Sequence, residues 1–148
     1  PKVPAIEILE AQNKNRLGVI SFILKGTHFN LVVKLLNDRF GIQTRGGCAC
    51  AGTYGHILLH VDQVHSYEIL EEMHKGDLSC KPGWMSIHPT MTDEEVHFIV
   101  NAIKEVAENY HDWKEEYEYD IHTNEYRHKK FEDPALSLMN EWFNKKMT

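Results

Sequence analysis

The sequence is poor in several features that would each point to a class of protein. It has three cysteines, an odd number without disulfide-framework spacing, which favours a reducing, cytoplasmic setting. No stretch approaches the roughly 18 apolar residues of a membrane span, and the N-terminus lacks a signal-peptide pattern. Basic residues number 16 against 22 acidic ones, for a formal net charge of −6. Because nucleic-acid surfaces need a basic face, we expect neither nucleic acid nor a membrane as a partner.

The composition is that of an ordinary soluble globular chain, with 42% hydrophobic and 26% charged residues. A chain of 148 residues can bury one core and form one domain. It begins without Met on a strand-like run over residues 5–9, so we expect a piece of a longer protein.

Hydrophobic periodicity predicts short strands that alternate with helices. One helix should begin after a Thr27 cap and stop at Gly41, and another should begin with a Thr92–Glu95 capping box. Strands are expected at 17–25, 42–45 and 84–88. Two further helices are expected at 56–61 and 66–74, and the helix with the capping box should span 92–110. We therefore predict an α+β fold, a small, mainly antiparallel sheet with helices packed on one face. The pattern alone also leaves a parallel α/β arrangement open.

Beyond residue 110 the composition becomes charged and aromatic. Residues 117–121 and 125–128 flank a turn and predict a β-hairpin, and Asp133-Pro134 can start a last helix. We treat 1–110 as the main domain and 111–148 as a C-terminal extension that packs on it.

The segment with the strongest chemical signal is Arg45-Gly-Gly-Cys-Ala-Cys-Ala51. A strand ends at Arg45, two glycines allow a sharp bend, and Cys48 and Cys50 follow among small residues. A cation near a thiol favours the nucleophilic thiolate, so Cys50 is a candidate nucleophile and Arg45 its candidate cation. Free cysteines are also often small buried hydrophobes, and the residues alone favour that second interpretation.

A metal site is a further alternative for the same segment. Cys48 and Cys50, together with His56 and His60 spaced as i, i+4 on one helix face, could supply four ligands. However, Cys-x-Cys is not the usual zinc spacing, so we expect no metal.

The motif and the β-α-β pattern before it resemble the C-terminal small domain of class-V aminotransferase-like enzymes, which are fold-type-I pyridoxal-phosphate-dependent transferases. The resemblance is greatest to the cysteine desulfurase and selenocysteine lyase family. There a strand ends in Arg-x-Gly-x-x-Cys-Ala, and the cysteine takes sulfur as a persulfide. Arg45, Gly47, Cys50 and Ala51 match that motif. The resemblance thus implies that Cys50 is the persulfide-forming nucleophile.

The resemblance continues through Lys81-Pro-Gly-Trp84 and residues 86–96, and covers about residues 5–110. One departure concerns substrate binding. The family has an Arg two residues before the serine of this strand, where it binds the substrate carboxylate. Here Trp84 stands two residues before Ser86, so the substrate-binding residues are unknown.

The resemblance also implies what lies outside the chain. In this family a lysine of a preceding large domain holds pyridoxal phosphate, and no lysine here has such a context. We therefore expect the chain alone to bind no cofactor and to be inactive. The full-length protein would be a homodimer acting on a small amino acid, with its own N-terminal cofactor domain as partner.

Two other interpretations stay open. The whole protein could be a class-V transaminase, epimerase or lyase that does not use the cysteine. The chain could also be a stand-alone thiol or metal carrier or an interaction module.

Overall fold

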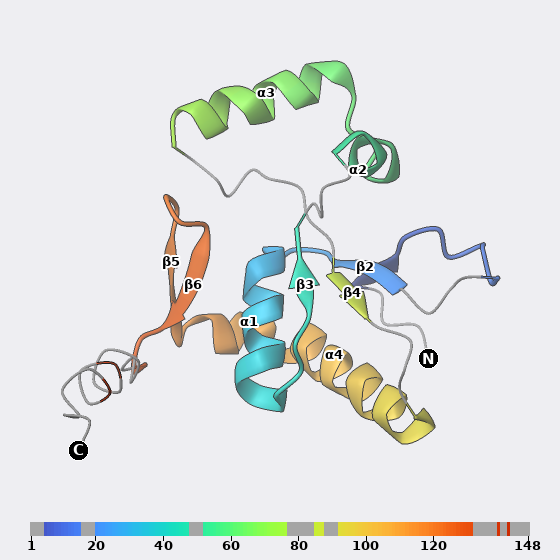
Figure 1. Ribbon diagram of the computed structural model, residues 1–148, viewed down its shortest axis with the longest axis vertical. Coiled ribbons are helices and arrows are strands. Elements are labelled where there is room, and N and C mark those ends of the chain that lie inside the picture. The colour runs from blue at the N-terminus through green and yellow to red at the C-terminus, as the bar shows by residue number, and fades with distance from the viewer. Residues whose placement is uncertain are drawn as a thin grey trace.

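The structure is a computed structural model that describes residues 5–15, 20–47, 52–76, 85–87 and 92–131, together with Met139 and Trp142. Figure 1 shows a small sheet and two packed helices, with a second pair of helices to one side and a separate hairpin. The strands are β1 (Ile6–Ile8), β2 (Ile20–Leu24), β3 (Arg45–Gly46), β4 (Met85–Ile87), β5 (Tyr117–Asp120) and β6 (Glu125–His128). The helices are α1 (Phe29–Phe40), α2 (Gly52–Leu58), α3 (Gln63–His74) and α4 (Asp93–Lys114).

The main sheet has the strand order β1-β2-β4-β3, and each neighbouring pair is antiparallel. Strands β2 and β3 therefore run parallel to each other with β4 between them, and α1 makes the connection that crosses over β4. This is an α+β arrangement. The parallel α/β alternative is wrong for the strands that the structure describes, because β4 hydrogen-bonds antiparallel to both β2 and β3.

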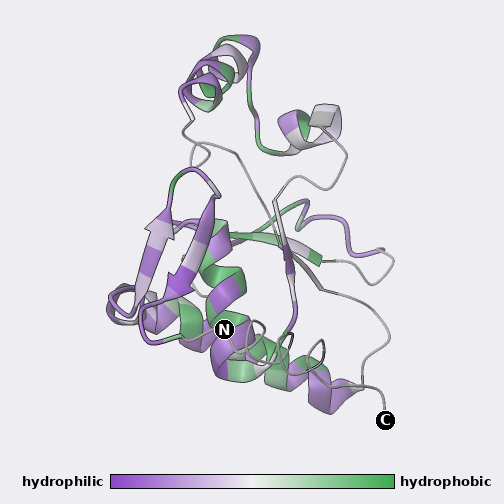
Figure 2. Cartoon of the chain, turned by 60° about the vertical axis from the view of Figure 1, so that its left-hand side comes forward, coloured by the Kyte–Doolittle hydropathy of each residue, from purple (hydrophilic) through white to green (hydrophobic). Residues whose placement is uncertain are grey.

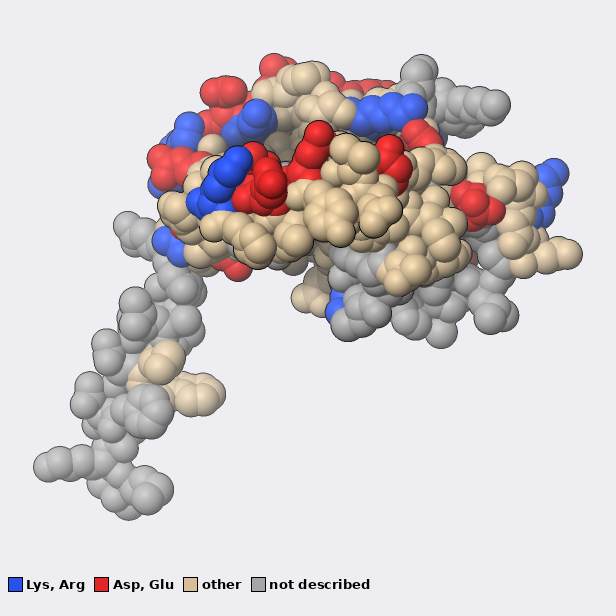
Figure 3. All heavy atoms as spheres, turned by 90° about the horizontal axis from the view of Figure 1, so that it is seen from above, with Lys and Arg blue, Asp and Glu red and all other residues tan. Residues whose placement is uncertain are grey.

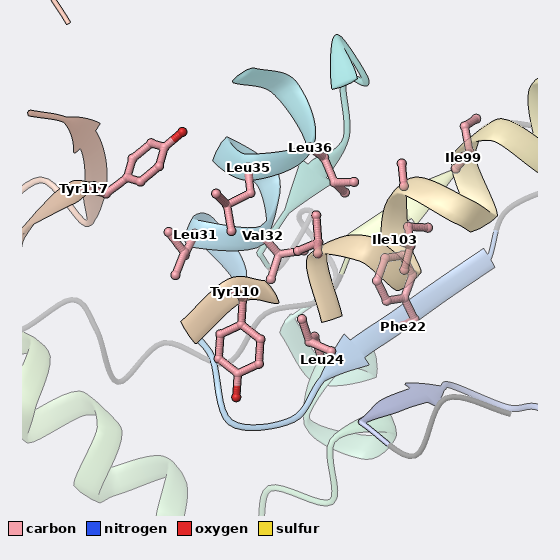
Figure 4. Close-up of a cluster of buried hydrophobic side chains, with 12 residues drawn as sticks. Phe22, Leu24, Leu31, Val32, Leu35, Leu36, Ile99, Ile103, Tyr110 and Tyr117 are labelled. Atoms are coloured by element: carbon pink, nitrogen blue, oxygen red, sulfur yellow. The ribbon is translucent and has the colours of Figure 1, made fainter. Parts of the chain in front are cut away.

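The core lies between β2, α1 and α4, whose apolar side chains converge in Figure 4. Alternation along β2 sends Phe22 and Leu24 to the same face of the sheet, where both are buried. Helical spacing places the apolar residues of α1 and α4 opposite them, so helices cover this face of the sheet. The buried helical residues are Leu31, Val32, Leu35, Leu36, Ile99, Ala102, Ile103, Val106 and Tyr110.

Helices α2 and α3 depart from the expectation that all helices pack on the sheet. No described side chain of α3 is buried, and Figures 1 and 2 show this pair apart from the core. Figure 3, seen from above Figure 1, shows charged side chains of both signs mixed with uncharged ones on the face nearest the viewer.

Helix ends confirm two of the three expected signals. Gly41 has φ 66°, a left-handed conformation suited to glycine, and its N–H donates to the Asn37 carbonyl at 2.9 Å. The Thr92–Glu95 capping box is present in full. The Thr27 cap is wrong, because His28 is the N-cap of α1 and its Nδ1 accepts a hydrogen bond from the Asn30 N–H at 3.2 Å.

The expected strand at 42–45 is also corrected, because β3 begins only at Arg45. The Ile42 N–H donates to the Leu36 carbonyl at 3.0 Å and so completes the helix cap begun by Gly41. A residue committed to that cap cannot donate to the sheet ladder, which delays the strand.

The expected bounds of three helices change. The helix expected at 56–61 is α2, which begins earlier, at Gly52, and ends at Leu58. Helix α3 begins at Gln63, because the Asp62 side chain caps it by accepting from the His65 N–H at 2.8 Å. Helix α4 continues beyond Tyr110 to Lys114.

The hairpin is confirmed, with β5 and β6 paired antiparallel and joined through residues 121–124. It packs against α1: Tyr117 is buried in the core cluster, and its hydroxyl donates to Asp38 Oδ2 at 3.1 Å. Beyond it, the expected last helix lies outside the described residues apart from Met139 and Trp142, which are both helical. Of the helices described, none has the length and apolar character to cross a membrane.

Candidate functional site

Strand β3 places Arg45 on the side of the sheet that α1 and α4 leave uncovered. Through β4, Arg45 lies in register with Ser21, and Gly46 lies in register with the core residue Phe22. Residues in register share a face, so Arg45 and Gly46 belong to opposite faces. The Arg45 side chain is exposed. A fixed cation thus stands at the last strand position before the glycine pair.

Gly46 and Gly47 are required by a close approach of α1. A Cβ on Gly46 would lie 2.7 Å from Phe29 Cδ2 and 2.8 Å from Val33 Cγ2, which is closer than real side chains pack. Gly47 has φ 88°, a conformation that favours glycine, and its Cβ would lie 3.3 Å from Phe29 Cε2. The two glycines therefore let α1 pack directly on the backbone of β3.

The two cysteines of the motif fall between Gly47 and the first residue of α2, Gly52. Cys48 and Cys50 lie outside the described residues, as do Trp84 and the substrate-binding position near it. The roles of Cys50 and Arg45 stay predictions, and the structure adds the position of Arg45 and of the glycines that precede the thiols.

After the cysteine segment, α2 and α3 line an open hollow of about 730 Å³, here called the α2–α3 hollow. Its lining is mainly apolar and comes from both helices and the turn between them. The lining residues are Thr53, His56, Val61, Asp62, Gln63, Ser66, Tyr67, Ile69, Leu70 and Met73.

A polar contact joins the two helices at this hollow. A ring nitrogen of His56, Nε2, lies 3.0 Å from Ser66 Oγ. The carboxylate of Asp62 also lines the hollow, but it is occupied as the cap of α3. With the Asp62 carboxylate engaged as a cap, the His56–Ser66 pair serves as a link between the two helices.

The metal alternative loses the arrangement on which it depended. His60 lies beyond the end of α2 and has φ 53°, a left-handed conformation, so His56 and His60 do not share a helix face. Within the described ranges, no group of three or more His, Cys, Asp or Glu side chains could hold a metal ion.

Pyridoxal phosphate needs a lysine for its Schiff base and hydrogen-bond donors for its phosphate. Among the described residues that line the α2–α3 hollow there is no Lys or Arg. A second hollow, of about 410 Å³ beside the hairpin, includes two cations, Lys34 and Arg127, but also three carboxylates, Glu118, Asp120 and Glu125. Lys34 Nζ already lies 3.8 Å from Asp38 Oδ1. The described lining of the α2–α3 hollow therefore does not fit the cofactor, and the three carboxylates of the second hollow would repel its phosphate.

Sequence reasoning missed His28, Phe29 and their contacts. His28 stacks on Phe29 and also contacts two hairpin tyrosines, Tyr119 and Tyr126. The available signal was the pair of aromatic residues in facing strands of the predicted hairpin, but nothing local indicated that they meet a helix ninety residues earlier.

Comparison with known proteins gives one match. The family model described as Aminotransferase class-V matches residues 1–99. No curated protein and no solved structure matches the chain. Because the matched residues are 99 of 148, about two thirds, the chain belongs to the class-V aminotransferase family, a family of pyridoxal-phosphate-dependent enzymes.

Proposed function

We propose that this member of the class-V aminotransferase family forms the C-terminal small domain of a cysteine desulfurase or selenocysteine lyase-like enzyme. Its N-terminal domain would hold pyridoxal phosphate, which supplies an electron sink for a bound amino acid. The working protein would be a cytoplasmic homodimer. The chain alone would be inactive, because the lysine that holds the cofactor would lie in that N-terminal domain.

The observation that carries the proposal is the position of Arg45. It is exposed on the uncovered face of the sheet, at the strand end from which the chain leads through two glycines to Cys50. A guanidinium is always protonated and stabilises a nearby thiolate. Arg45 would therefore raise the thiolate fraction of Cys50 at neutral pH.

In the proposed role, the Cys50 thiolate forms a new S–S bond to the sulfur of a substrate cysteine. The C–S bond of the substrate breaks, and its electron pair and a proton pass to the substrate carbon. The products are a Cys50 persulfide and alanine. No external oxidant is needed, because the sulfur is transferred while the substrate carbon is reduced.

Product release by the full-length protein tests the proposal against the alternatives within the family. Cysteine would be supplied, and alanine and sulfide would be measured for the parent, Cys50→Ser and the neighbouring control Cys48→Ser. We expect Cys50→Ser alone to abolish release. Equal release by the parent and Cys50→Ser would remove Cys50 from the mechanism and favour a transaminase, epimerase or lyase.

Arg45 is tested through the thiol itself. The pH dependence of Cys50 alkylation would be compared in the parent, Arg45→Lys and Arg45→Met. We expect the midpoint to rise in Arg45→Met and to move less in Arg45→Lys, because lysine keeps the charge. An unchanged midpoint in Arg45→Met would show that Arg45 is not the cation.

A further inference from the structure

The C-terminal hairpin reaches the candidate site through a series of ring contacts centred on His28. The His28 ring stacks on Phe29 with centroids 4.6 Å apart. It also lies 5.4 Å from Tyr119 and 5.9 Å from Tyr126, and the two tyrosine rings are 4.7 Å apart. These four residues, here called the ring series, join β5 and β6 to the first residue of α1.

The far end of the ring series touches the glycine pair of the motif. Phe29 packs so closely that a Cβ on Gly46 would lie 2.7 Å from its ring, and one on Gly47 would lie 3.3 Å from it. The Phe29 ring therefore bears on the backbone at the end of β3. A shift of the ring must move that backbone or open a gap beside it, because packed interiors tolerate neither overlap nor voids well.

Hydrogen bonds hold the hairpin turn against the same end of α1. The Asn30 side-chain amide donates to the carbonyl of Asn124. Asn124, which has φ 58°, also accepts a hydrogen bond from the Tyr119 hydroxyl at 2.8 Å. The turn is thus placed by both backbone and side chain, and this placement sets where the tyrosine rings meet His28.

A second, separate set of contacts anchors the hairpin at the other end of α1. Tyr117 donates to Asp38, and Arg39 forms an ion pair with Glu116 at 2.6 Å. The Arg39 guanidinium also lies over the Trp113 ring, 4.1 Å from its centroid. The hairpin is therefore anchored independently of the ring series, so changes in the ring series need not detach it.

We infer that the hairpin positions the end of β3 through the ring series, and that His28, Phe29 and Tyr126 are positioning residues for Gly46 and Gly47. The hairpin lies outside the family match at residues 1–99, whereas His28 and Phe29 lie within it. The effect of the hairpin on Cys50 rests on the proposed function, whereas its effect on Gly46 and Gly47 does not.

Two substitutions at His28 separate its ring from its role as a cap. His28→Asn keeps a good N-cap acceptor but removes the ring, and His28→Phe keeps a ring but removes the acceptor. Tyr126→Leu breaks the series from the hairpin side. Tyr117→Phe is the matched control, since it changes the independent anchor and leaves the ring series intact.

The first readout is the NMR amide signals of Gly46 and Gly47 in the whole chain. We expect His28→Asn and Tyr126→Leu to shift both signals, and His28→Phe and Tyr117→Phe to shift them less. Unchanged glycine signals in both His28→Asn and Tyr126→Leu would overturn the inference. Larger shifts in His28→Phe than in His28→Asn would also overturn it, because the cap rather than the ring would then control β3.

The second readout is the pH profile of Cys50 alkylation in a chain where Cys48 and Cys80 are replaced by serine. We expect His28→Asn to change the rate by about 2- to 30-fold, the range typical of coupled sites, and His28→Phe to change it less. An unchanged rate in His28→Asn would show that the series does not reach the thiol.

In the unsubstituted chain, which keeps Cys80, a Cys50 that is alkylated no faster than Cys80 would count against the proposed function, while the glycine signals would still decide the positioning role.

Discussion

Helices α1 and α3 have the same length but differ in how much of their surface is buried. Each contains 12 residues and begins at a side chain that accepts from a backbone N–H of the first turn. Helix α1 buries four side chains between β2 and α4, whereas α3 buries none. Capping thus explains where both helices begin, but only α1 gains the tertiary burial that supplies most helical stability.

The apolar residues of α3 make the contrast clearer. Val64 and Tyr67 are 69% and 61% exposed, although both belong to residue types that are usually at least partly buried. By comparison, Leu31 and Leu35 of α1 are 0% exposed. The difference lies in the neighbours: α1 has β2 and α4 beside it, while α3 meets α2 through the His56–Ser66 pair.

The largest expected effect comes from truncating one leucine in each helix. Leu35→Ala should lower the free energy of unfolding by about 2–5 kcal/mol, because a fully buried leucine leaves a cavity. Leu70→Ala, at a position 44% exposed, should change it by less than about 0.5 kcal/mol. Urea unfolding followed by circular dichroism measures both. Similar losses in the two variants would contradict the comparison.

A smaller effect should separate the caps of the two regions. Thr92→Ala removes the capping box of α4, a core helix, and should cost about 1 kcal/mol of global stability. Asp62→Ala removes the equivalent contact of α3, 2.8 Å in length, and should speed amide exchange within α3 without moving the global unfolding midpoint. A global loss in Asp62→Ala as large as in Thr92→Ala would show that α3 unfolds with the core.

The smallest expected effect comes from removing one tyrosine hydroxyl in each region, that of Tyr117 beside α1 and that of Tyr67 on α3. Burial, followed by the charge of Asp38 and the hydrogen bond to it, raises the pKa of Tyr117 above its ordinary value of 10.0. The contribution of the Tyr117 hydroxyl to the free energy of unfolding is therefore fully present below about pH 10. It is lost as the pH rises further, because this hydroxyl ionises at a lower pH in the unfolded chain than in the folded one.

Tyr117→Phe should consequently cost about 1 kcal/mol near pH 7, and the difference from the parent should shrink above about pH 10. Tyr67→Phe on α3 is the control and should leave stability near pH 7 unchanged, since its ring is exposed. Unfolding in urea at the two pH values provides the measurement. A Tyr117→Phe deficit that persists at high pH would refute the assigned ionisation effect.

Local signals in the sequence predicted much of the fold correctly. Gly41 and the Thr92–Glu95 box each act within one turn of a helix, so their neighbours in sequence are also their partners in space. The hairpin was predicted for the same reason, because its two strands are joined by a short turn. These elements depend on contacts between residues a few positions apart.

The errors came from choices among competing partners. Thr27 and His28 both lie next to the first turn of α1. The cap is His28, whose ring also contacts Tyr119 and Tyr126 of the hairpin. The start of β3 depends on Ile42, which completes the cap of α1 instead of joining the sheet. The predicted face shared by His56 and His60 was lost because the chain turns at His60.

The sequence by itself determined the family, the stop of α1 at Gly41 and the start of α4 at the Thr92–Glu95 capping box. Only the tertiary structure decided that Arg45 lies on the uncovered face, that Phe29 presses on Gly46, and that the hairpin contacts α1. The physical reason is the separation in sequence between the residues that interact. Caps and turns are set by hydrogen bonds between near neighbours, whereas a face or a ring contact depends on which distant segments exclude water together.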